Sequence, residues 1–137
     1  MKKVAVIVTR GSYNNLLQAC ELARIAASGG AQVSLLFRDE AASKLTCGRV
    51  AHLTFSDAYK GRESRTRELL GERKQADLPE LLRTLKSAGD VKLSICRDSV
   101  EWFELKVDDL LPELDEVQKA DAFWKEEIAS ADRVLTF

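Results

Sequence analysis

Residues 4–8 read Val-Ala-Val-Ile-Val, an apolar run rich in β-branched residues. Such a run is typical of a parallel strand that helices cover on both faces. Apolar residues recur at helical spacing over 16–27, Gly29 and Gly30 follow, and residues 32–37 (Gln-Val-Ser-Leu-Leu-Phe) predict a second strand. A strand, a helix and a strand within about 35 residues form a right-handed parallel unit. The sequence therefore predicts an α/β fold with a mostly parallel sheet.

Three later segments extend the predicted sheet to four or five strands. Residues 91–96 (Val-Lys-Leu-Ser-Ile-Cys) alternate between apolar and polar. This alternation predicts a strand with one face less deeply buried, or covered only on assembly. Residues 114–117 and 134–137 predict two shorter strands. The pattern over 38–59 is poor: residues 41–45 suggest a short helix, and residues 50–55 fit a helix, a strand or a loop.

Capping patterns mark two further helices. Residues 77–80 (Asp-Leu-Pro-Glu) have the form of a capping box with proline in the first turn. Residues 98–101 (Asp-Ser-Val-Glu) repeat the pattern, which predicts a short helix immediately after Cys96. We also expect a helix at 121–130 and an exposed helix within 60–75.

Length and charge limit the classes of function. With 137 residues, 45% of them hydrophobic and 31% charged, the chain suits a single domain spanning 1–137. With a net charge of -1, the chain lacks the positive electrostatic field that draws general nucleic-acid binders to their targets, so no direct nucleic-acid partner is expected. The apolar run at 4–8 is too short for a signal peptide or a spanning helix, which predicts a cytoplasmic protein without membrane association.

Motifs for metals and cofactors are missing from the sequence. The three cysteines lie far apart and only one histidine is present, which argues against a zinc site, a thioredoxin motif and a disulfide framework. The turn at 9–12 (Thr-Arg-Gly-Ser) matches neither a phosphate loop nor a dinucleotide fingerprint. We therefore expect no cofactor and no metal.

The carboxyl ends of the predicted strands carry the candidate binding residues, because ligands bind at these ends in open parallel α/β sheets. An arginine follows each of three strands: Arg10, Arg38 and Arg97. Together with Gly11 and Ser12 in the first turn, they are the candidate anion- or ligand-binding residues.

Cys96 ends its strand at a strand-to-helix turn and is the candidate catalytic residue. Neighbouring arginines and a helix amino terminus favour a thiolate, whereas Asp39 and Asp98 oppose it or pair with the arginines. From these features alone, a reactive Cys96 and an inert one are equally supported. We predict that Cys96 alkylates faster than Cys20, which lies on an apolar helix stripe in the predicted core.

Other side chains have weaker claims to a role in the site. Cys47 precedes Gly48 in the poorly patterned loop and is a second candidate, while His52 is left without a role. Four aromatic residues are expected in the core or at a subunit contact: Trp102, Phe103, Phe123 and Trp124.

Several sequence pieces, taken in order, carry a resemblance to a known family. They are residues 3–8 followed by Ser12-Tyr13, the helix 16–27, Ala31-Gln32-Val33, residues 89–96 with their terminal cysteine, Leu110-Leu111-Pro112, and the ending 131–137. In this order and spacing the chain resembles the DsrE/DsrF-like family, which includes TusD-type sulfur-relay subunits. Relay members usually have a smaller, less charged loop where Arg97, Asp98, Glu101 and Trp102 stand here.

The resemblance implies a flavodoxin-like three-layer sandwich assembled as trimers or hexamers. In sulfur-relay members it also implies a cysteine, matched here by Cys96, that accepts sulfane sulfur from a donor protein as a persulfide and passes it to an acceptor. A sulfurtransferase-like carrier is therefore one reading. An oligomer that binds a small ligand or a partner without covalent chemistry is the alternative.

Charge segregation also favours a homo-oligomer. Residues 101–127 hold ten acids against three bases, whereas residues 60–75 hold six bases against three acids. Opposite patches on one chain can meet across a subunit boundary and steer association.

Overall fold

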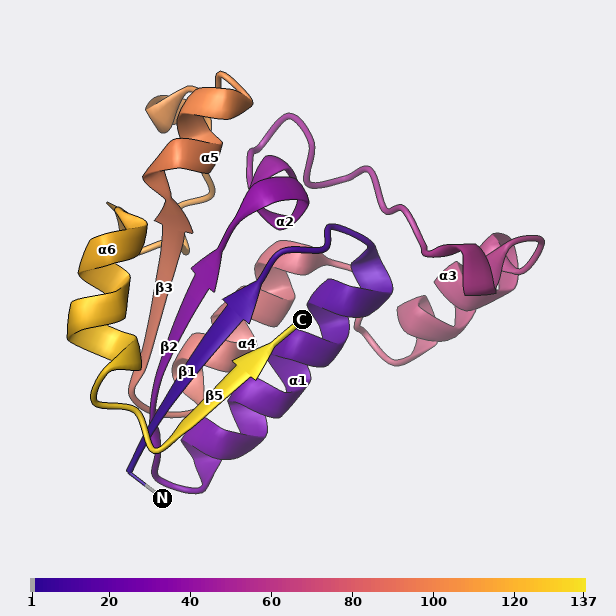
Figure 1. Cartoon of the computed structure of the whole chain (residues 1–137). Helices are drawn as coiled ribbons and strands as arrows, with labels where there is room; N and C mark the ends of the chain where they lie inside the picture. Colours follow the sequence, from indigo (N-terminus) through magenta and orange to yellow (C-terminus); the bar gives the residue numbers. More distant parts are fainter. Residues whose placement is uncertain (1) are drawn as a thin grey trace.

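Five parallel strands form one sheet, in the order β4-β3-β2-β1-β5, in the computed structural model, which describes residues 2–137 (Figure 1). The strands are β1 (Lys3–Val8), β2 (Gln32–Phe37), β3 (Val91–Cys96), β4 (Glu116–Gln118) and β5 (Arg133–Thr136). Every pairing between neighbours is parallel. The predicted α/β fold is confirmed, and β1 has a strand on each side.

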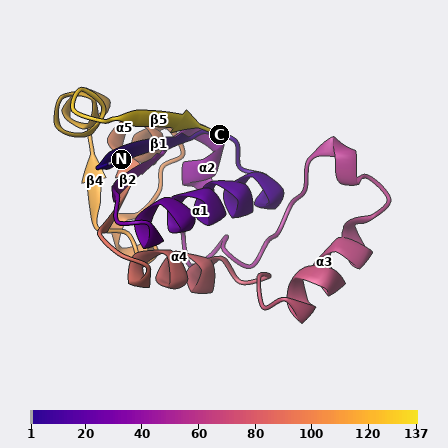
Figure 2. The ribbon, with the colours of Figure 1, turned by 90° about the horizontal axis from the view of Figure 1, so that it is seen from below.

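Helices cover both faces of the sheet and make three layers (Figure 2). The α-helices are α1 (Tyr13–Ser28), α2 (Asp39–Ser43), α3 (Glu63–Glu72), α4 (Leu78–Ser87), α5 (Arg97–Trp102) and α6 (Ala120–Phe123). Short 3-10 turns lie at η1 (Asp57–Tyr59) and η2 (Val107–Asp109), and a π-helical turn, η3 (Trp124–Ile128), continues α6. Helices α1 and α4 pack on one face, α6 with η3 lies on the other, and α3 projects away from the sheet.

The face under α1 and α4 holds the main core. Alternate residues of a strand point to the same side. Val4, Val6 and Val8 therefore share this face with Leu35 and Phe37 of β2, and all five are fully buried. The helices add leucines to the same core: Leu16, Leu78, Leu82 and Leu85. At about 1.5–3 kcal/mol for each large apolar side chain buried, this face supplies most of the hydrophobic free energy of folding.

The opposite face is thinner and more polar. Its buried apolar cluster holds four residues: Ala5, Leu36, Cys96 and Phe123. Ile7, Ile128 and Ala131 are only partly buried beside it. One short helical segment, α6 with η3, covers this face, so Cys96 lies in the lesser of the two cores.

One capping prediction and one burial prediction are wrong. The strand β3 runs directly into α5, so Cys96 is the N-cap and Asp98 lies within the first turn. At α4, Asp77 is the N-cap residue and Pro79 lies in the first turn, as predicted, although the Asp77 side chain makes no capping hydrogen bond. Residues 93–96 are buried on both faces of β3, because α6 covers the side that the alternation predicted to be less buried.

The predicted aromatic residues separate into two groups. Phe123 is fully buried, as expected of a core residue, whereas Trp102 is 67% exposed and Trp124 is 61% exposed. The two tryptophans therefore lie outside the core of the single chain. Over residues 2–137, no helix combines the length and the apolar character needed to cross a membrane.

Candidate functional site

The carboxyl ends of β1, β2 and β3 form one connected edge, as predicted. The Arg38 backbone N–H donates to the Val8 carbonyl at 2.8 Å, which joins the ends of β2 and β1. The Asp39 N–H donates to Ser99 Oγ at 2.8 Å and so ties the end of β2 to α5. Asp39 has a φ of 51°, a left-handed conformation that aspartate tolerates better than most residues. The turns after these strands are thus held together.

Cys96 lies at this edge with its side chain directed into the protein. It has 0% exposed surface and packs with Ala5, Leu36 and Phe123. Its φ and ψ of -69° and 128° continue the strand conformation up to the first residue of α5. The sulfur therefore lies beneath α6, and not in solvent beyond the strand ends.

Strand register places three polar side chains around Cys96. Gln118 of β4 is its direct partner across the sheet, and Ser94 lies two residues earlier on the same face of β3. On the other side, the last pair in register is Phe37 with Ile95. Arg38 continues β2 in extended conformation, with φ -129° and ψ 162°, so the next step of the register places it beside Cys96.

These three side chains all carry buried polar atoms without a partner. Within residues 2–137, four buried side-chain atoms lack a hydrogen bond: Arg38 Nε, Ser94 Oγ, Gln118 Oε1 and Glu113 Oε1. Three of the four thus belong to neighbours of Cys96. Ser94 is 1% exposed and Gln118 is 5% exposed. A buried unpaired polar group costs about 1–3 kcal/mol, and a cluster of them calls for a functional explanation. We call Arg38, Ser94, Cys96 and Gln118 the Cys96 site.

Of the five predicted binding residues, the register brings only Arg38 beside Cys96. Arg10 Nη2 donates to Asn15 Oδ1 at 3.3 Å, at the start of α1. Gly11 has a packing role, because a Cβ there would lie 2.7 Å from the Glu40 carbonyl oxygen. Ser12 precedes α1, and its carbonyl accepts the Leu16 N–H at 3.0 Å.

Arg97, the fifth predicted binding residue, is exposed in the first turn of α5. The predicted pairing of the arginines with Asp39 or Asp98 is not seen: none of the ion pairs formed among residues 2–137 includes either aspartate. A binding role for the five residues stays a prediction.

The other two cysteines have contrasting environments. Cys20 is 3% exposed in the main core, as predicted, and burial raises its thiol pKa to about 12. Cys47 is exposed, and its backbone N–H donates to the Asp109 carbonyl at 2.8 Å. His52 is exposed in the irregular segment that follows Cys47. Cys20 and Cys47 are therefore natural references for the reactivity of Cys96.

Ser94 and Gln118 were not among the residues predicted for the site. The alternation within 91–96 places Ser94 on the face of Cys96, but nothing in that pattern shows that the face is buried. The predicted fourth strand, 114–117, stopped one residue before Gln118. Only the pairing of β3 with β4 reveals that Gln118 lies opposite Cys96.

Comparisons with known proteins agree with this fold. The model of the DsrE/DsrF-like family matches residues 2–137. Among curated proteins, no sequence matches the chain. Among solved structures, MTH1491 from Methanobacterium thermoautotrophicum, a protein of unknown function, matches with a TM-score of 0.61 and 13% identity over 100% of both chains. At this identity, the structural likeness supports the fold alone.

Proposed function

We propose that this chain, which belongs to the DsrE/DsrF-like family, is a sulfur-relay protein that carries sulfane sulfur as a persulfide on Cys96. Family membership supports the sulfur-relay class. The observation that favours Cys96 as the carrier is the cluster of unpartnered polar atoms in Arg38, Ser94 and Gln118 around it.

The proposed reaction consists of two sulfur transfers without net oxidation or reduction. The Cys96 thiol first loses its proton, and the thiolate attacks the outer sulfur of a persulfide on a donor protein. A new S–S bond forms at Cys96, the donor's S–S bond breaks, and the donor leaves as a thiolate that takes up a proton. An acceptor thiolate then attacks the outer sulfur on Cys96 and releases the Cys96 thiolate.

The polar neighbours suit the anions of this cycle. The guanidinium of Arg38 is always charged, and its free Nε–H can donate to a thiolate or to a persulfide anion. The Ser94 hydroxyl can donate to the same sulfur. Gln118 Oε1 can only accept, so it suits the protonated thiol or persulfide. The site therefore offers a partner for both protonation states of the sulfur.

Binding without covalent chemistry is the second candidate function. The observation that favours it is the complete burial of Cys96, since a nucleophile must be reached by its donor. In this reading the protein is an oligomer, a trimer or hexamer, that holds a partner. The exposed Trp102 and Trp124 support such contacts, because aromatic residues are enriched in interface cores.

Mass spectrometry of the intact protein separates the two candidates. We would incubate the protein with sodium polysulfide, remove the excess, and look for the mass of added sulfur on C47S and on the double variants C20S/C47S and C47S/C96S. Because Cys47 is exposed and can itself react with polysulfide, C47S is the reference: the proposal expects loading in C47S and in C20S/C47S, and none in C47S/C96S, with the far-ultraviolet circular dichroism unchanged. Loading that persists in C47S/C96S would remove Cys96 as the carrier.

A further inference from the structure

Two side chains of the α6–η3 segment are buried against the sheet. Across residues 120–131, Phe123 and Glu127 are buried, while the rest are exposed or partly exposed. Phe123 and Glu127 are four residues apart and so face the same way. Phe123 covers Cys96 in the smaller core, whereas the other anchor, Glu127, is a carboxylate. Ile128 and Ala131 are partly buried beside the same core, so the segment over the Cys96 site has one fully buried apolar anchor, Phe123, and one buried charged anchor, Glu127.

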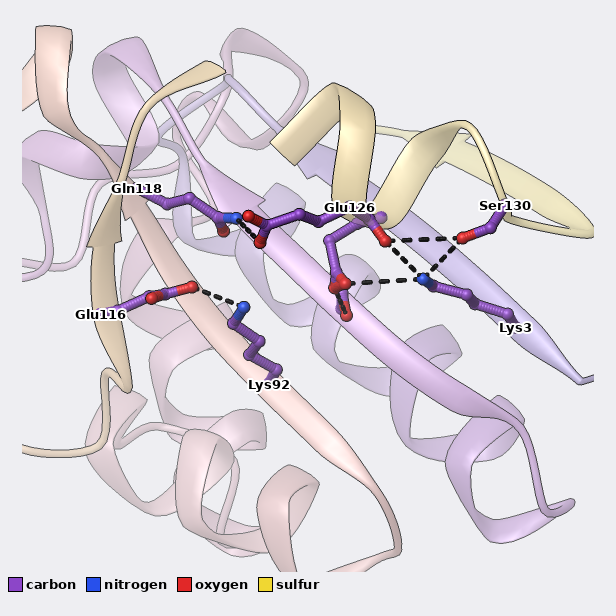
Figure 3. Close-up of polar contacts among 8 residues, drawn as sticks. Lys3, Lys92, Glu116, Gln118, Glu126 and Ser130 are labelled. Atoms are coloured by element: carbon purple, nitrogen blue, oxygen red, sulfur yellow. Dashed lines mark hydrogen bonds and ion pairs between the residues drawn. The ribbon is translucent and has the colours of Figure 1, made fainter. Parts of the chain in front are cut away.

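Polar contacts fasten this segment to the first two strands (Figure 3). Lys3 Nζ of β1 lies 3.5 Å from Glu127 Oε1 and donates to the Glu126 carbonyl at 2.6 Å and to Ser130 Oγ at 2.8 Å. Ser34 of β2 donates its hydroxyl proton to Glu127 Oε2. A single lysine thus contacts three residues of the segment. Glu127 is only 7% exposed beneath it.

A further contact joins the segment to the Cys96 site itself. Gln118 Nε2 donates to Glu126 Oε2 at 3.1 Å, while Gln118 Oε1 is left without a partner (Figure 3). The helix is also irregular here, since the Ala129 N–H donates to the Trp124 carbonyl in a π-helical turn. Such turns are rare and are frequent at functional sites. Several of the contacts between the segment and the sheet are therefore polar ones that water can replace.

We infer that α6–η3 is a movable cover over Cys96 and that the Lys3–Glu127 pair is its latch. The inference rests on the proposed function, because it concerns access to the same sulfur. Displacing the segment removes Phe123 from Cys96 and opens the space in which a donor's persulfide must approach. It also exposes Ser94 Oγ and Gln118 Oε1, whose missing hydrogen bonds penalise the closed state. The main core under α1 and α4 is unaffected, so opening does not require global unfolding.

Alkylation of the three native cysteines tests the cover. We would treat the native protein with iodoacetamide at neutral pH and follow Cys20, Cys47 and Cys96 by peptide mass spectrometry. Cys47 is exposed and reports the unhindered rate, and Cys20 in the main core reports global opening. In E127Q, which keeps the shape of Glu127 but removes its charge, Cys96 should label about tenfold faster or more, since a buried charge-assisted contact is lost. Cys20 should label at its wild-type rate.

The pair between Lys92 and Glu116 provides a matched control. These side chains lie 2.5 Å apart on the same face of the sheet and join β3 to β4 (Figure 3). Glu126 and Glu127 act on Lys92 through their charges, but no hydrogen bond or ion pair among residues 2–137 joins Lys92 or Glu116 to the cover. E116Q should therefore leave the Cys96 rate within about twofold of wild type, as expected for an ion pair that is partly exposed. Equal acceleration of Cys96 in E116Q and E127Q would overturn the latch.

The variant F123A provides a second, independent test of the cover. Removing the ring should accelerate labelling of Cys96 more than of Cys20, and amide hydrogen exchange should rise at Ala129 and Ala131 but not in β1 and β2. If Cys20 accelerates in parallel with Cys96, or if neither variant changes the Cys96 rate, the cover is refuted. Sulfur loading is a separate readout: a Cys96 that opens but never loads refutes the proposed carrier function and leaves the cover intact.

Discussion

Gln118 is the direct cross-strand partner of Cys96, and its side-chain amide is half satisfied: Nε2 donates to Glu126, while Oε1 has no partner. The residue thus connects the covering segment to the sulfur site. A buried amide oxygen that accepts no hydrogen bond lowers the stability of the fold, so a donor is expected beside it. The proposed persulfide on Cys96 supplies this donor when it is protonated. The predictions below separate the contributions of the residues around it.

Arg38 should assist loading through its charge and its Nε donor. Replacing it by glutamine should slow polysulfide loading of Cys96 about 10- to 100-fold, the range expected when a hydrogen bond of about 1.5–3 kcal/mol to a charged group is lost. Lysine should restore part of the rate because it keeps the charge without the fork geometry. Loading rates from timed mass spectra measure this.

The matched control for this prediction is R10Q. Arg10 lies at the same edge of the sheet, but it bonds Asn15 at the start of α1. Sulfur loading of Cys96 in R10Q should therefore proceed at nearly the wild-type rate. A loss in R10Q as large as in R38Q would point to a general electrostatic field and against a specific contact.

The Ser94 hydroxyl should lower the stability of the fold and assist sulfur loading. Its hydroxyl is buried without a partner, so S94A should raise the free energy of unfolding by up to about 1 kcal/mol in urea titrations. The same change should slow sulfur loading, because a donor to the sulfur is gone. S34A is the comparison: Ser34 donates to Glu127, so that variant should be less stable than wild type. Destabilisation by S94A would show that the hydroxyl has a partner in the native protein.

Cys20 should make the protein less stable in alkali. Burial raises its pKa to about 12 in the fold, whereas an unfolded cysteine titrates near pH 8.5. The unfolded state therefore loses this proton first, and the stability that the neutral thiol provides is complete below about pH 8.5 and is lost as pH rises towards 12. Urea titrations from pH 7 to 10 should show a falling free energy of unfolding, and C20A should flatten that slope.

A homo-oligomer is expected in solution. Trp102 and Trp124 are exposed, and α3 projects from the sheet within the basic stretch 60–75, so the tryptophans and this stretch can contact other subunits. Light scattering at micromolar concentration should give a mass of a trimer or hexamer of the 15.3 kDa chain. Changing both tryptophans to alanine should lower that mass while circular dichroism stays unchanged. A wild-type mass near that of one chain at moderate salt would contradict the prediction.

Local patterns in the sequence determined much of this protein. The β-branched run at 4–8, the helix that follows it and the strand 32–37 are set by short-range periodicity, and the structure confirms all three. The position of Cys96 at a strand end, before a helix, is equally local. So is the place of Arg38 after a strand, because parallel strands align their carboxyl ends at one edge.

The tertiary structure alone decided what surrounds Cys96. Phe123 and Glu127 lie about 30 residues further along the chain, and Gln118 reaches Cys96 only through the pairing of β4 with β3. Alternation within a strand shows which side chains share a face, but not which element covers that face. The burial of the sulfur therefore depended on where a short, polar helix packs. That choice is made by contacts between distant residues, whose free energies no local pattern contains.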